Sequence, residues 1–252
     1  MVAASVWSAG RSAQEREGPA VVAMFRYAMI TIASLVAASA LAQQQGEPPA
    51  PAPTTAAASN AIVPMAEPLP GDHWTYEVRD EITGKISATR EIVVTEVTPA
   101  DISVRWRISG TNNTEGLDVY DRSWNLKSSG PWKYLPNDGS GIRSPLQIGA
   151  RWNFQADDIN AGSGRILKRT GDSKVVGQET ITTKAGTFDT FKIETFISRR
   201  LTNDRTRKEE FTGQTWYAPA IDHWVKRAIV SRADNHLRSN NTIELVAYGR
   251  KQ

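Results

Sequence analysis

The sequence predicts a mainly β domain with little helix: a single antiparallel, strongly curved sheet that forms a half-barrel or a barrel. Three observations predict this fold. Apolar residues recur at every second position in several runs, turn-forming residues separate these runs at short intervals, and no stretch of more than ten residues has a 3.6-residue apolar period. About ten strands in one layer must cover their apolar face, and a curved sheet does so.

The clearest strand covers residues 102–109, ISVRWRIS. Ile, Val, Trp and Ile fall on one face of it, and Ser, Arg, Arg and Ser fall on the other. The same alternation appears at 74–78 and 191–197, whereas 92–94 is more uniformly apolar. Strands with one apolar and one polar face are half buried, as is typical of antiparallel sheets.

Turn residues separate the strands and predict sequential hairpins. The signals are Thr83-Gly84, Pro99-Ala100-Asp101, Asn203-Asp204 and Asp234-Asn235. The last two predict hairpins that pair 188–201 with 206–217 and 223–232 with 237–248. The C-terminal half should therefore form a continuous antiparallel meander.

Residues 126–145 differ from the rest of the domain. They contain Pro131, Pro136 and Pro145 among several glycines. This composition predicts a long irregular connection that covers one end of the sheet.

The segment 24–42 is predicted to be a secretory signal peptide. It has a basic Arg26, an apolar run from Tyr27 and the small-residue triplet Ala40-Leu41-Ala42 before Gln43. The run is shorter than the roughly 20 apolar residues that a spanning helix needs, although an uncleaved anchor stays open as the alternative. Residues 1–23 are interpreted as an upstream extension, with Met24 as the true start.

Residues 43–70 hold seven of the 13 prolines among Ala, Thr and Gln. This composition predicts a disordered linker, and the alternative is a spacer that lets the domain reach away from the membrane. The β-rich domain then covers 71–252, which is long enough to bury a core without a metal or a partner.

Charge and cysteine content exclude several classes of function. The 252 residues include 30 basic and 27 acidic side chains, a net charge of +3 that predicts no nucleic-acid partner. Cysteine is absent, which excludes disulfides, thiolate nucleophiles and lipid attachment to a cysteine. After signal cleavage we expect no stable membrane span.

No catalytic constellation is recognisable. Gly162-Ser163-Gly164 lacks the spacing of a nucleophile elbow, and Asp157-Asp158 reads as a turn. The three histidines have no metal-ligand spacing: His73, His223 and His236. Four glutamates on predicted strands are better explained as solvated: Glu179, Glu194, Glu209 and Glu210. We therefore expect no enzymatic activity, no metal and no cofactor.

The tryptophans are the candidate ligand-binding residues. Seven of the eight lie in the domain. Five of them either fill the core or line an apolar cavity in the curved sheet: Trp74, Trp106, Trp152, Trp216 and Trp224.

Two segments carry a resemblance to a known family. Residues 176–188 read VGQETITTKAGTF, and WYAP at 216–219 is followed by Trp224-Val225-Lys226. Together they resemble a family of exported bacterial domains of unknown function that is similar to the half-barrels of periplasmic lipoprotein carriers. The resemblance covers about the C-terminal two-fifths of the chain and implies a location and a fold, with no activity. The family pattern has a glycine in the turn after the proline, where this chain has Ile221-Asp222-His223.

The motif residues have structural explanations: Gly186, Phe188, Trp216, Tyr217 and Pro219. Gly186 can adopt the positive φ of a tight turn, and Phe188 then returns to the apolar face. Pro219 ends the strand that reaches Tyr217.

The sequence thus favours a non-enzymatic periplasmic protein, secreted across the inner membrane, that binds or carries an apolar ligand such as an acyl chain. The alternative is a structural or assembly-interaction protein of the cell envelope whose partner is an envelope protein.

Overall fold

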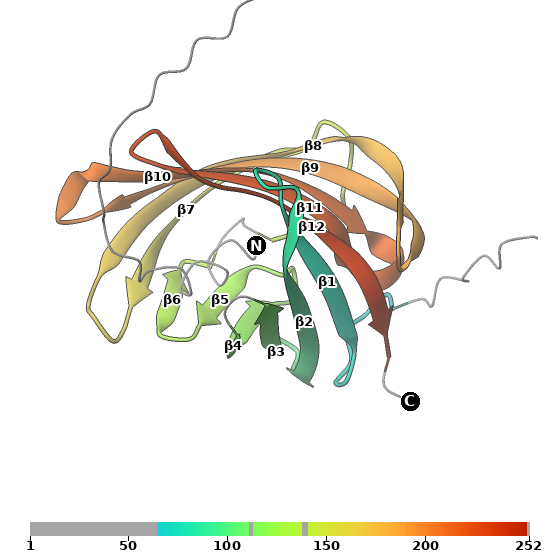
Figure 1. The fold of residues 1–252 in the computed structure, drawn as a ribbon. Coiled ribbons are helices and arrows are strands. Elements are labelled where there is room, and N and C mark those ends of the chain that lie inside the picture. Colours follow the sequence, from blue (N-terminus) through green and yellow to red (C-terminus); the bar gives the residue numbers. More distant parts are fainter. Residues whose placement is uncertain (1–64, 111–112, 138–140, 251–252) are drawn as a thin grey trace, which may run out of the picture. The chain divides into compact units, whose positions relative to one another are not determined.

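The computed structural model describes residues 65–110, 113–137 and 141–250. Within them, twelve antiparallel strands form one closed barrel, in which each strand pairs with its sequence neighbours and β1 pairs with β12 (Figure 1). The strands are β1 (His73–Asp80), β2 (Lys85–Val97), β3 (Asp101–Gly110), β4 (Thr114–Asp121), β5 (Leu126–Ser129), β6 (Trp132–Leu135), β7 (Arg151–Asn160), β8 (Ile166–Thr183), β9 (Gly186–Leu201), β10 (Asp204–Ala218), β11 (His223–Ala233) and β12 (His236–Gly249).

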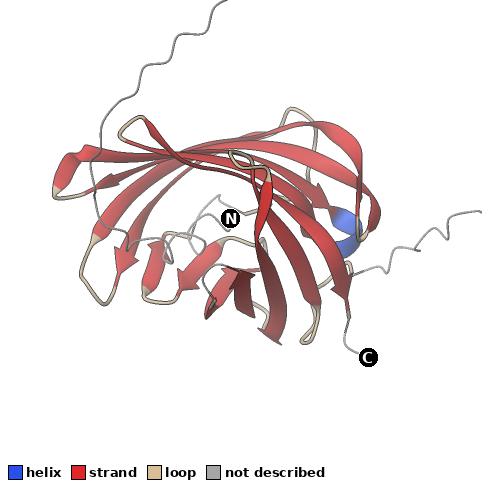
Figure 2. Cartoon of the chain, in the orientation of Figure 1, coloured by secondary structure: helices blue, strands red, loops and turns tan. Residues whose placement is uncertain are grey.

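The predicted fold class is confirmed. Because the sheet closes on itself, it is a barrel and not a half-barrel. The only helix in the described residues is the 3-10 turn η1 (Pro219–Ile221) between β10 and β11 (Figure 2). None of the described residues forms a helix that is long and apolar enough to cross a membrane.

The strands predicted from alternation are present. In β3 the four apolar positions are buried while Arg105 and Arg107 are exposed. The two C-terminal hairpins, β9–β10 and β11–β12, also form as predicted. Asp234 and Asn235 both have positive φ, 50° and 67°, the conformation that a two-residue hairpin turn requires and that Asp and Asn tolerate.

The prediction of one irregular connection over 126–145 is wrong for its first half. Residues 126–135 form the short β5–β6 hairpin around Gly130, which has a φ of 51°. Strands of four residues are too short for alternation to be visible in the sequence. Farther along, Ile142 and Leu146 pack against buried side chains of the barrel.

The chain contacts the barrel before the predicted domain boundary. Met65, placed in the linker by composition, is fully buried, and its N–H donates to the carbonyl of Ala220 at 2.8 Å. One apolar residue among prolines and alanines gives no periodic signal. The predicted extension 1–23, the signal peptide 24–42 and the linker as far as residue 64 lie outside the described residues.

Buried side chains form two apolar clusters. The larger is formed mainly by β1–β4 with β11 and β12, and the smaller by β7–β10. Trp106 of β3 pairs with Gly116 of β4, and its indole ring lies over this glycine. A Cβ at position 116 would be 2.6 Å from the ring, so only glycine leaves room for it. Charged and polar side chains are also buried, and they form the candidate site.

Candidate functional site

The five candidate tryptophans are not all brought together. Trp74, Trp106, Trp216 and Trp224 all belong to the larger buried cluster, and Trp152 lies in the smaller one. Trp216 is on the other face of β10 from its neighbour Tyr217, because Tyr217 pairs with Trp224 and Phe191, whereas Trp216 pairs with Lys226 and Lys192.

Trp216 is enclosed by charged side chains on that second face. Its Nε1–H donates to Glu179 at 2.7 Å, a bond that lowers the pKa of this carboxylate. The ammonium groups of Lys192 and Lys226 lie 5.0 Å and 5.6 Å from the centre of the ring. Trp216 thus belongs to the same buried cluster as Trp224, but Glu179, Lys192 and Lys226 contact its indole on the second face.

His223 lies at the centre of an aromatic group. Trp74 stacks on the imidazole with ring centres 4.3 Å apart, and Trp124 meets it edge-on at 4.8 Å. The Tyr76 hydroxyl is 2.6 Å from Nδ1 of His223 and donates to the carbonyl of Trp224 at 3.1 Å. Strand alternation places Tyr76 on the same face as Trp74, so its burial beside Trp74 could have been predicted from the sequence. Trp124 lies in the connection after β4, where no alternation indicates which way a side chain points.

We expect the His223 imidazole to remain neutral at pH 6. Burial, with a smaller contribution from the charge of Arg227, lowers its pKa well below the ordinary value. The unfolded chain binds this proton below about pH 6.5 and the folded chain does not, so this residue makes the free energy of unfolding fall as pH falls. Imidazole ¹⁵N NMR measures the charge directly, and a protonated ring at pH 6 would contradict the burial.

Asp222 occupies the turn in which the family pattern has glycine. Its φ is 45°, a left-handed conformation that Asp adopts more readily than most residues. Its carboxylate accepts hydrogen bonds from the Tyr217 hydroxyl and from Nε1–H of Trp124. Burial raises the pKa of Asp222 to about 6, so its ionisation makes the free energy of unfolding fall as pH rises from about 4 to 6.

A buried ion pair lies on the inner face of β2–β4. Arg90 and Asp118 are 3.8 Å apart with almost no exposure, and Asp118 also accepts bonds from Trp106 Nε1–H at 2.9 Å and Tyr120 O–H at 3.1 Å. Burial lowers the pKa of Arg90 and raises that of Tyr120 well above its ordinary value. The carboxylate thus neutralises one guanidinium and holds two aromatic side chains.

Arg227, on β11, is the second buried guanidinium of this region. It is 8% exposed and lies over the ring of Trp224, 4.6 Å from its centre. Its Nε–H is buried without a hydrogen-bond partner in the described residues, as is Nε1–H of Trp74. Burial lowers the pKa of Arg227 to about 10, which leaves it a cation at pH 7.

A second charged cluster joins β7, β8 and β9. The Asp158 carboxylate accepts a hydrogen bond from Nε–H of Arg169 at 2.9 Å and lies 3.2 Å from Nε of Arg199. Arg199 also lies 3.9 Å from the carboxylate of Glu209. Asp157 and Asp158 therefore do not form the turn that was expected, because both lie within β7 and Asp158 is buried. Alternation along β7 puts Asp158 on the face of Trp152 and Phe154, where it pairs with cations instead of meeting water.

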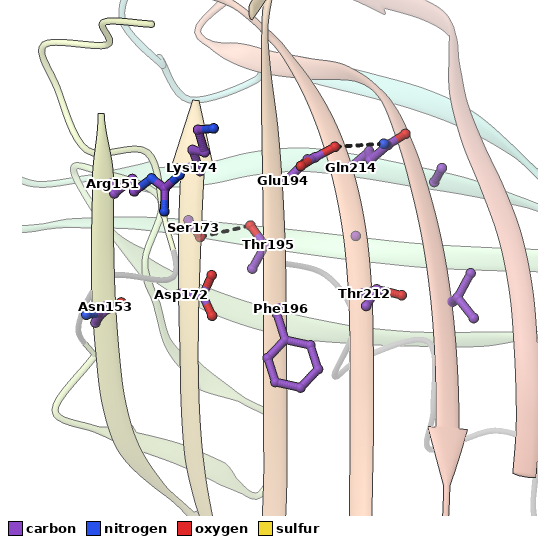
Figure 3. Close-up of a pocket in the computed structure, with 13 residues that line it drawn as sticks. Arg151, Asn153, Asp172, Ser173, Lys174, Glu194, Thr195, Phe196, Thr212 and Gln214 are labelled. Carbon is purple, nitrogen blue, oxygen red and sulfur yellow. Dashed lines mark hydrogen bonds between the residues drawn. The ribbon is translucent and has the colours of Figure 1, made fainter. Parts of the chain in front are cut away.

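A groove of about 670 Å³ crosses β7–β11 on the face opposite the buried Phe154 and Ile193. Phe196, 37% exposed, projects into it from β9 between Asp172 and Thr212 (Figure 3). The remaining side chains are mostly polar or charged, with Arg151, Lys174, Glu194 and Gln214 toward one end (Figure 3). A mixed groove of this kind suits a polar partner better than an acyl chain.

The described residues contain no group of three or more His, Asp or Glu side chains placed to hold a metal ion. What the interior offers is recognition chemistry: aromatic walls, neutral hydroxyl and imidazole groups, and a guanidinium that can bind an anion.

Part of the chain matches a known family. Residues 154–227 match the DUF3108-like family. This range includes both segments, 176–188 and 216–226, that carry the sequence resemblance. The predicted resemblance to a family of domains of unknown function is therefore confirmed. None of the curated proteins compared with the chain matches it significantly.

Several solved structures are similar to the chain. Three of them are a proposed lipoprotein from Parabacteroides distasonis (12% identity, 74% of this chain and 99% of that chain, TM-score 0.49), a proposed exported protein with a YmcC-like fold from Bacteroides fragilis (13%, 75% and 99%, 0.41) and the hypothetical lipoprotein YmcC from Escherichia coli (10%, 73% and 87%, 0.42).

Proposed function

We propose that the chain is a non-enzymatic, carrier-like protein of the periplasm that holds an apolar ligand, such as an acyl chain, within the barrel. The export step rests on the signal-peptide pattern at 24–42. One observation carries the binding role: the inner face combines an aromatic wall with buried donors that the described chain leaves unpaired, on Trp74 and Arg227.

This combination favours binding over packing alone. Buried polar groups in native proteins are almost always paired, and an unpaired donor costs about 1–3 kcal/mol. A core that served only stability would be more stable with apolar residues at these positions. Ligand sites, in contrast, are apolar surfaces with a few convergent polar groups.

Native mass spectrometry and lipid extraction of the full chain, purified after export, test the proposal. We expect a co-purifying lipid and displacement of N-phenyl-1-naphthylamine from the purified protein. Trp224→Ala removes part of the aromatic wall and should weaken dye binding about tenfold, the equivalent of about 1.4 kcal/mol.

Trp216→Ala is the matched control, because it removes the same side chain from the other face of the neighbouring strand. It should leave dye affinity unchanged. A protein that carries no lipid and binds no dye would refute the proposal, and equal losses in both variants would refute the interior location.

A second candidate is the assembly-interaction protein, and the outer groove with its exposed Phe196 favours it. A photo-crosslinking residue at position 196 should then capture one envelope protein in living cells, whereas the same residue at the exposed position 105 of β3 should not. Identical crosslinking patterns from both positions would argue against a partner at the groove.

A further inference from the structure

We propose that the ligand is an amphiphile with an anionic oxygen head group, a carboxylate or a phosphate, and that Arg227 binds this head. The inference rests on the carrier function proposed above and names the chemical class of its ligand. It follows from the way Arg227 differs from the other buried arginines.

The other two buried guanidiniums, and the partly buried guanidinium of Arg199, each have a carboxylate beside them. Arg90 lies 3.8 Å from Asp118, and Arg169 and Arg199 lie 2.9 Å and 3.2 Å from Asp158. Arg227 has no carboxylate within ion-pair distance among the described residues; its polar surroundings are Tyr76, Tyr120 and the like charge of Arg90.

No neighbouring side chain can supply the missing negative charge. Burial raises the pKa values of Tyr76 and Tyr120 well above the ordinary value, so both remain neutral phenols at pH 7. His223 is neutral as well, because burial lowers its pKa. With Asp118 held by Arg90, Trp106 and Tyr120, none of the described carboxylates is left within ion-pair distance of Arg227.

The chemistry of the group indicates what would complete it. A buried guanidinium without a counter-ion is unfavourable, and an anion that reaches it removes that cost. Arginine binds carboxylates and phosphates through two parallel N–H bonds, whereas it gains little from an alcohol or an ester. The guanidinium lies over the ring of Trp224, on which Tyr76 stacks at 3.8 Å, so the side chains around the bound head group would be aromatic.

The test compares ligands with one chain length and different heads. The full exported chain is delipidated, and its affinity at pH 7.5 is measured for hexadecanoate, hexadecyl phosphate, hexadecanol and inorganic phosphate, below the micellar concentrations. We expect both anionic amphiphiles to bind at least about tenfold more tightly than hexadecanol. Inorganic phosphate should bind more weakly than hexadecyl phosphate, because it lacks the apolar body.

Variants at one position then assign the effect. Arg227→Gln should bring hexadecanoate to the affinity of hexadecanol, and Arg227→Lys should restore part of the difference. Arg105→Gln, on the exposed face of β3, is the control and should leave all affinities unchanged. The comparison of ligands on the unaltered protein stands even where a variant folds poorly.

The outcomes separate the two proposals. Equal affinity for hexadecanol and hexadecanoate would overturn the anionic head group and leave the carrier function intact. Binding of inorganic phosphate as tight as that of hexadecyl phosphate would show a site for a free anion and overturn the amphiphile. Failure of every amphiphile to bind would overturn the carrier function itself.

Discussion

Replacing Asp118 with alanine is expected to lower the free energy of unfolding by about 3–5 kcal/mol, because it leaves the charge of Arg90 buried without its carboxylate. The same change removes the acceptor of the Trp106 indole and the Tyr120 hydroxyl. Urea denaturation followed by tryptophan fluorescence measures the loss.

Glu115→Ala is the matched control on the same strand. Glu115 lies 3.7 Å from Arg107, nearly the separation of the buried pair, but the two side chains are 66% and 56% exposed. Exposed ion pairs contribute at most about 1 kcal/mol, so this variant should be close to the unaltered protein. Similar losses in both variants would mean that burial does not set the strength of the Asp118 contacts.

Gly171→Ala is expected to destabilise the barrel by about 3 kcal/mol, at the upper end of what overpacking costs. A Cβ at this position of β8 would lie 2.3 Å from Cζ of Phe154 and 2.5 Å from the main-chain oxygen of Phe196. The ring could rotate away, but the oxygen belongs to the paired strand β9 and cannot move without disturbing the ladder. Thermal unfolding monitored by circular dichroism gives the change in Tm.

Gly177, in the same strand, supplies the comparison. No atom lies within 4 Å of a Cβ built there, so Gly177→Ala should change stability by less than about 0.5 kcal/mol. If Gly177→Ala were as damaging as Gly171→Ala, chain flexibility in β8 and not the contact with Phe196 would explain the loss.

The strands that could be predicted are those long enough to alternate. Residues 102–109 and the two C-terminal hairpins carry four or more alternating positions, and the turns between them contain Asn and Asp. The β5–β6 hairpin has strands of four residues, in which alternation cannot be distinguished from chance. The pairing of β1 with β12 could not be predicted for a different reason. It depends on the number and curvature of all twelve strands, and no local sequence pattern indicates these.

The candidate site was only partly visible for similar reasons. Trp74 and Trp224 were chosen as aromatic residues, and the structure buries both beside His223. Adjacent aromatic residues such as Trp216 and Tyr217 must face opposite ways, and the sequence does not tell which faces inward. The burial of Arg227 could have been inferred from alternation, since Arg227 shares a strand face with Ile229 and the buried Ser231. A charged residue in such a position is, however, easily interpreted as solvent-exposed.

Closure between β1 and β12 also sets the order in which the barrel can be completed. His73 pairs with Gly249, so the first strand waits for nearly the last residues of the chain before its second edge is hydrogen bonded. Hairpins along the chain can form locally. Pairing β1 with β12 instead closes a loop of nearly the whole domain, so it has a larger entropic cost and is expected to form slowly. A nascent chain that has not yet released β12 presents two open edges, on β1 and β11, and such edges are where molecules add strands to one another.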